Sequence, residues 1–264
     1  MPQSVEQVTP RLATFSISAR CTRTGQLGVG ISTKFIAVGA LAPNAKAQVG
    51  ACSSQAFVNP YHRYWMIENL SQGQSAEEAL RNSLTKDPRP QLRQLAIVDA
   101  QGRSAAHTGE WCDTWCGHQA GLNYAAAGNM LANGDVVAEL ARVFEETEGS
   151  DLPLAKRLMR CLEAAQAVGG DKRGKQSAAL LVVDTEGYPK IDLRVDDHPD
   201  PVTELHRIYE LFRTEFEETL AGLPSKADPA GKIGEDYLRE VTVQGQSPGE
   251  FQTKILRFSN LELT

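Results

Sequence analysis

The chain has 264 residues, of which 41% are hydrophobic and 23% are charged, and its formal net charge is -6. This composition is typical of a globular protein with an ordinary core. The acidic balance, with scattered Lys and Arg, argues against nucleic-acid or anionic-membrane binding, and the sequence lacks the run of about 18 apolar residues that a membrane span requires.

The N-terminal residues and the cysteines indicate the cellular compartment of the protein. The first 13 residues lack the basic start and apolar segment of a secretory signal. An odd number of cysteines in a large chain favours free thiols in a reducing environment over a disulfide framework. We therefore expect a cytoplasmic protein.

The first 55 residues predict a meander of strands. Residues 14–20 alternate between apolar and polar side chains, residues 24–26 form a turn signal, and residues 27–32 read as the returning strand of a hairpin. Residues 36–41 and 48–52 are further short apolar runs, which we also interpret as strands.

Helices alternate with strands in the rest of the chain. Ser75 and Glu78 form a capping-box pattern at the start of a helix. Amphipathic helices are predicted at 135–147, 151–168 and 201–221, and strands at 95–99 and 177–183, the latter central and buried. This order predicts an α+β fold with antiparallel sheets and outer helices.

The sequence also predicts boundaries. Residues 1–13 form an N-terminal extension or propeptide, residues 14–221 form the domain, and residues 222–264 form an appendage of low definition that begins near Pro224.

Thr14 and two lysines form the first candidate for chemistry. An N-terminal threonine can act as nucleophile while its own α-amine accepts the proton. A nearby lysine, Lys34 or Lys46, would keep that amine neutral and stabilise the oxyanion. The alternative is that Thr14 is a strand residue and both lysines are surface charges.

A segment rich in Cys and His forms the second candidate. It contains His107, Cys112, Cys116 and His118, which could hold zinc or supply a Cys nucleophile with a His base. The spacing matches no common zinc finger, so we expect no metal, and packing residues are the alternative reading.

A charged loop forms the third candidate. Residues 169–177 stop a helix at two glycines and lead into the buried strand. Loops that feed a central strand often carry sites, although this one could be a solvated turn. Its glycine spacing fits neither phosphate-binding fingerprint.

Four segments in the same order resemble one known family. These segments are residues 14–60, 107–131, 169–183 and 192–209, and they are similar to the DUF1028 family, a bacterial and archaeal group of unassigned function in the Ntn-hydrolase (N-terminal nucleophile) superfamily. The resemblance covers about residues 14–213.

The resemblance implies an αββα four-layer sandwich of two antiparallel sheets flanked by helices. It also implies a nucleophile at Thr14, because family members often begin Met-Thr and lose the methionine. Proteasome subunits, which are also Ntn hydrolases, carry a lysine about 32 residues after their threonine. That count leads to Lys46, while Lys34 is the competing position.

This chain departs from the family pattern because 13 residues precede Thr14. Removal of the initiator methionine cannot expose Thr14. Either the Ala13–Thr14 bond is cleaved, as in self-processing precursors, or the chain is not an active hydrolase.

Our leading hypothesis is therefore a cofactor-free amidohydrolase that acts on a small amide or ureide-like substrate. Thr14 is the nucleophile, and Lys46 or Lys34 gives electrostatic support. The residues expected to line the substrate pocket are Asn59, His107, Asn129, Asp171, Arg173 and Gln176. We expect a homo-oligomer that binds no nucleic acid and no membrane. The alternative is a non-catalytic binding or assembly protein with the same fold.

Overall fold

The computed structural model describes residues 11, 12 and 14–232. The chain divides into two compact units, one ending at Glu210 and the other beginning at Leu211. In the second unit the structure describes a short helix, α7 (Glu217–Leu220). No helix among the described residues has the length and apolar character that crossing a membrane would need.

One sheet of the first unit has six antiparallel strands in the order β11-β10-β3-β2-β9-β8. Its strands are β2 (Thr14–Arg20), β3 (Leu27–Thr33), β8 (Gly117–Gly121), β9 (Tyr124–Gly128), β10 (Ser177–Val183) and β11 (Ile191–Val195). β2 and β3 form a hairpin in which Thr14 pairs with Thr33, so the strand that begins at Thr14 lies in the middle of this sheet.

The other sheet has five antiparallel strands in the order β1-β5-β6-β7, with β4 also paired to β5. Its strands are β1 (Arg11–Leu12), β4 (Pro43–Lys46), β5 (Gly50–Phe57), β6 (Arg93–Asp99) and β7 (Ser104–Thr108). β4 and β1 therefore lie one after the other along the same side of β5.

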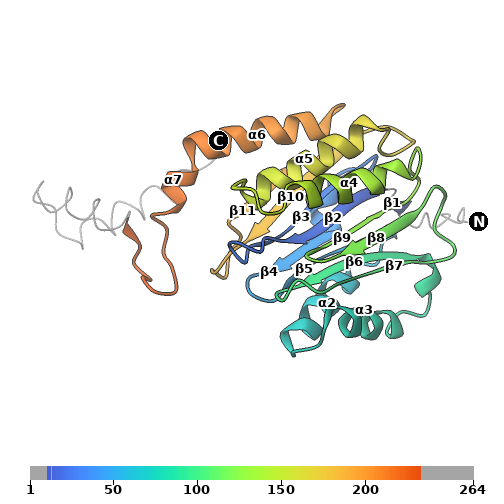
Figure 1. The fold of residues 1–264 in the computed structure, drawn as a ribbon, viewed down its shortest axis with the longest axis horizontal. Helices are drawn as coiled ribbons and strands as arrows, with labels where there is room; N and C mark the ends of the chain where they lie inside the picture. Colours follow the sequence, from blue (N-terminus) through green and yellow to red (C-terminus); the bar gives the residue numbers. More distant parts are fainter. Residues whose placement is uncertain (1–10, 13, 233–264) are drawn as a thin grey trace, which may run out of the picture. The chain divides into compact units, whose positions relative to one another are not determined.

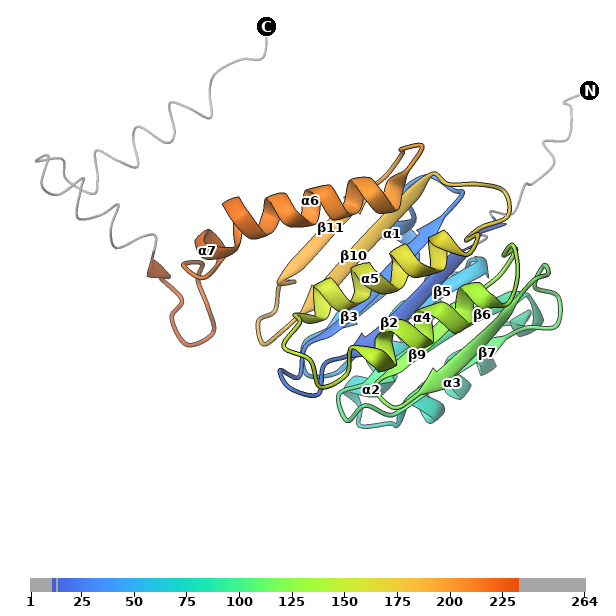
Figure 2. The ribbon, with the colours of Figure 1, turned by 45° about the horizontal axis from the view of Figure 1, so that its top comes forward.

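The two sheets face each other, and helices cover their outer faces (Figure 1). Helices α2 (Tyr61–Ser71) and α3 (Ala76–Thr85) pack on the five-stranded sheet. Helices α4 (Asp135–Glu146) and α5 (Leu154–Ala167) pack on the six-stranded sheet, where Figure 2 shows α5 running across β10, β3 and β2. The first unit is thus built of four layers: helices, sheet, sheet, helices.

Alternation along the strands decides what each layer contains. Leu27, Val29 and Ile31 of β3 pack between the sheets against Ala51 and Val98. The opposite face of β3 is flat: a Cβ at Gly28 would lie 2.6 Å from the Leu181 carbonyl oxygen and 3.1 Å from Leu158 of α5. Glycine at this position lets α5 lie close to the sheet.

Most of the predicted elements are confirmed. The hairpin at 14–33 forms as expected, and Ser75 caps α3 with a complete capping box. β10 is buried, although it is the second strand from the edge. The long helix predicted at 201–221 is two helices, α6 (Pro201–Glu215) and α7.

The strand predicted at 36–41 is wrong. Residues Val38–Leu41 form the short helix α1, preceded by Ala37 in the left-handed region at φ 54°. Ser177 explains this turn, because its hydroxyl donates to the Phe35 carbonyl and accepts from the Val38 N–H at 3.1 Å. A tertiary contact overrides the strand preference of this apolar run.

Candidate active site

Thr14 is held at the start of β2 by three hydrogen bonds to Thr33 and Asn129. Its hydroxyl donates to Thr33 Oγ1 at 3.3 Å. Its N–H donates to the Asn129 carbonyl at 3.2 Å, and the Asn129 N–H returns a bond to the Thr14 carbonyl at 3.0 Å. The Thr14 side chain is fully buried in the intact chain.

The chain changes sheets immediately before Thr14. Arg11 and Leu12 pair with Phe57 and Ala56 at the end of β5, in the five-stranded sheet. Thr14 already pairs with Thr33 in the six-stranded sheet. The chain therefore passes from the five-stranded sheet to the six-stranded sheet between Leu12 and Thr14.

A buried polar stripe joins the two sheets beside Thr14. Its members share amide or hydroxyl side chains that face the opposite sheet: Ser16, Ser53, Gln55, Gln94, Thr108 and Asn129. Gln55 accepts from Ser16 at 2.8 Å and donates to Gln94 at 2.8 Å and to the Thr14 carbonyl at 3.5 Å.

Gln94 is the centre of this stripe. Its Oε1 accepts from Gln55 and from Asn129 Nδ2, the latter at 2.9 Å. Its Nε2 contacts Thr108 Oγ1 at 2.9 Å and the Gly128 carbonyl at 2.8 Å. One fully buried amide thus fixes the side chain of Asn129 and ties it to the other sheet.

Asp171 organises the loop at the end of β3. Its buried carboxylate accepts from the Lys34 N–H at 2.8 Å and from the Arg173 N–H at 2.9 Å. It also pairs with the Arg173 guanidinium at 2.9 Å. Because Lys34 follows Thr33, this loop lies at the Thr14 end of the sheet.

Lys34 and Gln176 are placed at the same end. Lys34 Nζ donates to the Lys175 carbonyl at 3.2 Å. The Gln176 N–H donates to the Thr33 carbonyl at 3.0 Å, while its side chain contacts Asp197 at 3.1 Å. Of the predicted site residues, the structure gathers Thr14, Lys34, Asn129, Asp171, Arg173 and Gln176.

Lys46 lies at the other end of the five-stranded sheet. It pairs with Gly50 at the start of β5, whereas Gln55, which contacts Thr14, lies five residues further along that strand. At about 3.4 Å per residue, this separation is roughly 17 Å. Lys46 Nζ instead contacts Ser71 at 3.1 Å, so the structure does not bring Lys46 to Thr14.

Asn59 and His107 belong to the outer side of the five-stranded sheet. Asn59 Nδ2 donates to Asp87 at 2.9 Å. His107 contacts the Pro90 carbonyl at 3.0 Å and pairs with Leu95, whose side chain faces α2 and α3. Neither residue faces Thr14.

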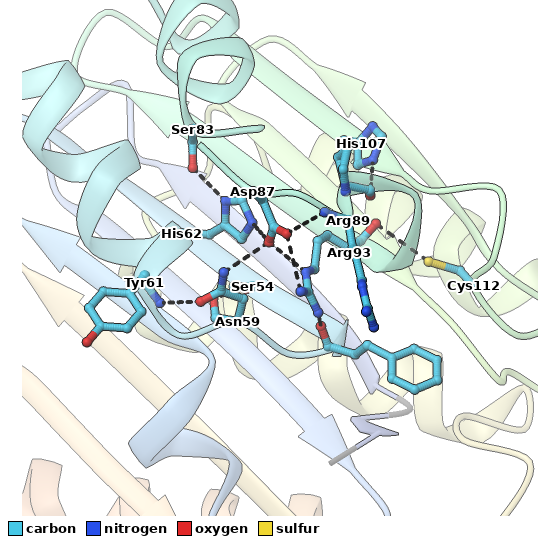
Figure 3. A network of polar contacts seen from close by, with 12 residues as sticks. Ser54, Asn59, Tyr61, His62, Ser83, Asp87, Arg89, Arg93, His107 and Cys112 are labelled. Atoms are coloured by element: carbon cyan, nitrogen blue, oxygen red, sulfur yellow. Dashed lines mark hydrogen bonds and ion pairs between the residues drawn. The ribbon is translucent and has the colours of Figure 1, made fainter. Parts of the chain in front are cut away.

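Asp87 is the centre of a second buried network, which lies between α2, α3 and the end of β5 (Figure 3). His62 lies between Asp87, at 2.8 Å, and Ser83, at 2.7 Å. Arg93 Nε donates to Asp87 at 2.7 Å. Burial raises the pKa of Asp87, but hydrogen bonds from Arg93 and Asn59 outweigh it and hold that pKa well below its usual value.

The same network changes the pKa of His62. Burial lowers the pKa of His62, and this effect exceeds the opposing effect of its bond to Asp87. The imidazole is therefore neutral at neutral pH and serves as a buried link between Ser83 and Asp87. Although the residues are Ser, His and Asp, all three are buried and none faces Thr14.

The cysteine-rich segment is a packed loop. Cys112 contacts the Arg93 carbonyl and Cys116 contacts the Cys112 carbonyl, both at 3.5 Å. Burial raises the pKa of Cys112 to about 11, so its thiol is protonated at neutral pH and is a poor nucleophile. His118 bonds to Thr108 at 2.8 Å. Within the described residues, no group of three or more His, Cys, Asp or Glu is placed to hold a metal.

Sequence reasoning missed the amides that surround Thr14. Gln55 and Gln94 belong to β5 and β6 but lie outside the strands predicted at 48–52 and 95–99, and Thr33 follows the strand predicted at 27–32. Polar residues at every second position of 14–18 and 53–55 were a usable signal, because such a pattern places them on one face. Nothing in the sequence indicates that the two polar faces meet.

The fold and site define a class: an α+β protein of two facing antiparallel sheets, with a threonine at the start of a central strand. Residues 14–205 match a family described as a family of unknown function, DUF1028. The chain belongs to the DUF1028 family. The matched region begins at Thr14.

A solved structure of the same family is similar to this chain. The crystal structure of protein SPO2555 from Silicibacter pomeroyi, of the same family, is 30% identical with a TM-score of 0.75 and covers 83% of this chain and 98% of that chain. The structure of Anbu (ancestral beta-subunit) from Yersinia bercovieri is 12% identical with a TM-score of 0.37, and the match covers 80% of this chain and 98% of that chain. A comparison with curated proteins found no match.

Proposed function

We propose that this protein is an Ntn-type amidohydrolase whose nucleophile, Thr14, is released by cleavage of the Ala13–Thr14 bond. One observation carries the proposal: Thr14 opens a central strand, held by Thr33 and Asn129, at the point where the chain crosses between sheets. In this proposal the four layers are the Ntn-hydrolase sandwich.

The chemistry would use two groups of Thr14. After processing, its α-amine would lie where its N–H now lies, beside the Asn129 carbonyl. An α-amine titrates near pH 8, so part of it is neutral at pH 7 and can accept the hydroxyl proton. The hydroxyl oxygen attacks the substrate carbonyl, and the amine half of the substrate leaves with the proton that the α-amine accepted. Water then hydrolyses the ester between Thr14 and the acyl half.

The electrostatic support would come from Lys34 and not from Lys46. Lys34 follows the partner of Thr14, whereas Lys46 lies at the far end of β5. Asp171 holds the Lys34 backbone and the Arg173 guanidinium at the same edge. Arg173 is the group in this loop suited to a substrate carboxylate, because a guanidinium binds carboxylates in a bidentate manner.

Asn129 supports this assignment by its bonds to both the backbone of Thr14 and Gln94. Asn59 and His107 are assigned to the scaffold. The described cysteines are all free thiols.

The second candidate function is a binding or assembly protein that is never processed. The burial of Thr14 in the intact chain favours it, since a hydroxyl with no exposed surface cannot meet a substrate. Cleavage of the Ala13–Thr14 bond separates the two functions, because it would remove the residues that precede Thr14 and free its amine.

The test is the intact mass of the purified full-length chain. We expect the loss of the 13 residues before Thr14 from the wild type. Thr14→Ser keeps the hydroxyl and should process more slowly, and Thr14→Ala should not process at all. Both variants should unfold at urea concentrations close to that of the wild type, because removal of one weak hydroxyl contact changes stability little.

Processed protein is then assayed with amides and cyclic ureides, with Lys34→Met and Lys46→Met as a matched pair. Lys34→Met should reduce turnover strongly and Lys46→Met should not. A wild-type chain that keeps residues 1–13, or a Thr14→Ala variant that turns over substrate at the wild-type rate, contradicts the proposal.

A further inference from the structure

Two of the residues that precede Thr14 are already bound as a strand. Arg11 and Leu12 run antiparallel to the end of β5, opposite Phe57 and Ala56. In the proposed processing step these two residues belong to the acyl side of the bond that Thr14 attacks. The intact chain therefore shows how one acyl chain is positioned for this nucleophile.

Other segments of the chain pair with the same side of β5 from Gly50 to Ser54. β4 pairs with residues Gly50–Ser53, and the Ser54 N–H donates to the Ala42 carbonyl at 3.0 Å. The stretch beside Ala56 and Phe57 belongs to β1. Cleavage before Thr14, followed by loss of residues 1–13, would vacate this stretch of strand edge and no other part of it.

The receiving end of β5 is anchored independently of β1. Arg93 pairs with Ala56 on the opposite side and donates to the Phe57 carbonyl at 2.5 Å. Arg93 is itself fixed by Asp87, as Figure 3 shows. Asp87 and Asn59 are bonded at 2.9 Å, which also fixes the turn that follows. The end of β5 should therefore keep its shape when β1 leaves, as a preorganised binding edge does.

Resting on the proposed function, we infer that the processed protein binds the acyl half of its substrate as an added strand beside Ala56 and Phe57. Main-chain pairing of this kind recognises an extended chain with regularly spaced amides. The substrate class is then a peptide-like amide with at least two residues ahead of the scissile carbonyl. Cyclic ureides and simple acyl amides cannot make this pairing.

Processing and substrate hydrolysis share an ester on the Thr14 hydroxyl. In processing the Thr14 nitrogen is itself the leaving amine, whereas in substrate hydrolysis it is the free α-amine that carries the proton. The Thr14 hydroxyl oxygen bonds to the scissile carbonyl carbon, the C–N bond breaks, and the leaving amine takes the hydroxyl proton through the α-amine. Water then adds to the ester, releases the acid and restores the hydroxyl. No further reactant is required.

The experiment compares two fluorogenic amides on processed, full-length-derived protein: acetyl-Arg-Leu-Ala-aminomethylcoumarin and acetyl-Ala-aminomethylcoumarin. We expect kcat/KM at least about tenfold higher for the longer amide, since two main-chain hydrogen bonds of about 1 kcal/mol each would be gained. Equal values for the two amides would overturn the inference.

Two N-methylated peptides supply the matched control. In an antiparallel pair only alternate residues direct their N–H groups to a given neighbour. Of the two methylations, one at the Arg nitrogen and one at the Leu nitrogen, only one should therefore abolish the advantage of the longer amide. Equal tolerance of both methyl groups would show that the chain is not bound as a strand.

Uncleaved Thr14→Ala provides the second control. Acetyl-Arg-Leu-Ala-amide should bind processed wild type and not this variant, in which β1 still covers the edge. If the wild type is processed and hydrolyses small amides but shows no preference for the longer one, this inference fails alone. If the wild type is never processed, the proposed function fails with it.

Discussion

His62 belongs to the buried polar network around Asp87. Its ring has no exposed surface and lies between Ser83 and Asp87. Burial lowers the pKa of His62 because the charged ring would lose its hydration. The folded protein therefore resists protonation that the unfolded chain accepts.

The first prediction concerns pH and His62. The unfolded His62 binds a proton as the pH falls through about 6.5, and the folded one does not until lower pH. Its contribution to stability is therefore complete above pH 6.5 and is lost as the pH falls toward the folded pKa. We expect the free energy of unfolding in urea to fall by about 1 kcal/mol more between pH 7.5 and 5.5 in wild type than in His62→Gln.

Glutamine is the suitable replacement because its amide can still donate to Asp87 and accept from Ser83. The pKa of Asp87 is held below its usual value, so this carboxylate stays ionised across the range. The other histidines are common to both proteins. Identical pH slopes for the two proteins would show that His62 does not carry this effect.

At the scale of elements, local sequence patterns predicted the helices and strands that have a regular apolar face or a capping motif. The capping box at Ser75 and the alternation of 14–20 gave α3 and β2 correctly. β8 and β9, GHQAG and YAAAG, were not predicted, because small residues give no alternation to detect.

The candidate site was predictable only through the family resemblance. Thr14 was predicted as nucleophile and Asn129, Asp171 and Arg173 as pocket residues, and all four lie at one end of the six-stranded sheet. Lys46, which a residue count predicted beside Thr14, contacts Ser71 at the other end of β5. A count fixes a position along the chain, but the lengths of turns decide which end of a sheet that position reaches.

Contacts between elements are the source of the second prediction. Arg157 of α5 is buried and closes the end of α4, donating to the Phe144 carbonyl at 2.8 Å and to Glu148 at 2.6 Å. Arg157→Met removes the guanidinium, so the Phe144 carbonyl and the Glu148 carboxylate lose their donor. We expect a loss of about 3 kcal/mol in the free energy of unfolding, measured in urea.

Arg142→Met is the matched control. Arg142 pairs with Glu139 and Glu146 on the surface of α4, where such pairs contribute less than about 1 kcal/mol. Arg157→Lys should fall between the two, since it keeps the charge but not the fork of donors. Equal losses for Arg157→Met and Arg142→Met would contradict the role of Arg157.

Across the whole first unit, the interface between the sheets has two different halves. One half is apolar and centres on Leu27, Val29 and Ile31. The other half is the polar stripe, which reaches from Ser16 to Thr108 and passes beside Thr14. An apolar interface would hold the sheets equally well, so we propose that the stripe also positions Thr14.

The last prediction tests that arrangement through Gln94. Gln94→Met has a similar volume but removes the acceptor of Gln55 and Asn129, and leaves buried carbonyls without their donor. Unsatisfied buried groups cost about 1–3 kcal/mol each. We expect a loss of about 2–4 kcal/mol in urea unfolding, together with slower appearance of the processed mass, because Asn129 is no longer fixed against Thr14.

Thr108→Val separates stability from position. It removes the contacts of the Thr108 hydroxyl with Gln94 and with the exposed side chain of His118, and leaves Gln94 Nε2 bonded to the Gly117 and Gly128 carbonyls. Its cost should therefore stay at about 1 kcal/mol, and processing should be unchanged. Leu95→Ala, on the outer face of the same strand, should lose about 2–5 kcal/mol with normal processing. If Leu95→Ala slows processing as much as Gln94→Met at equal stability loss, the stripe acts only through folding and does not position Thr14.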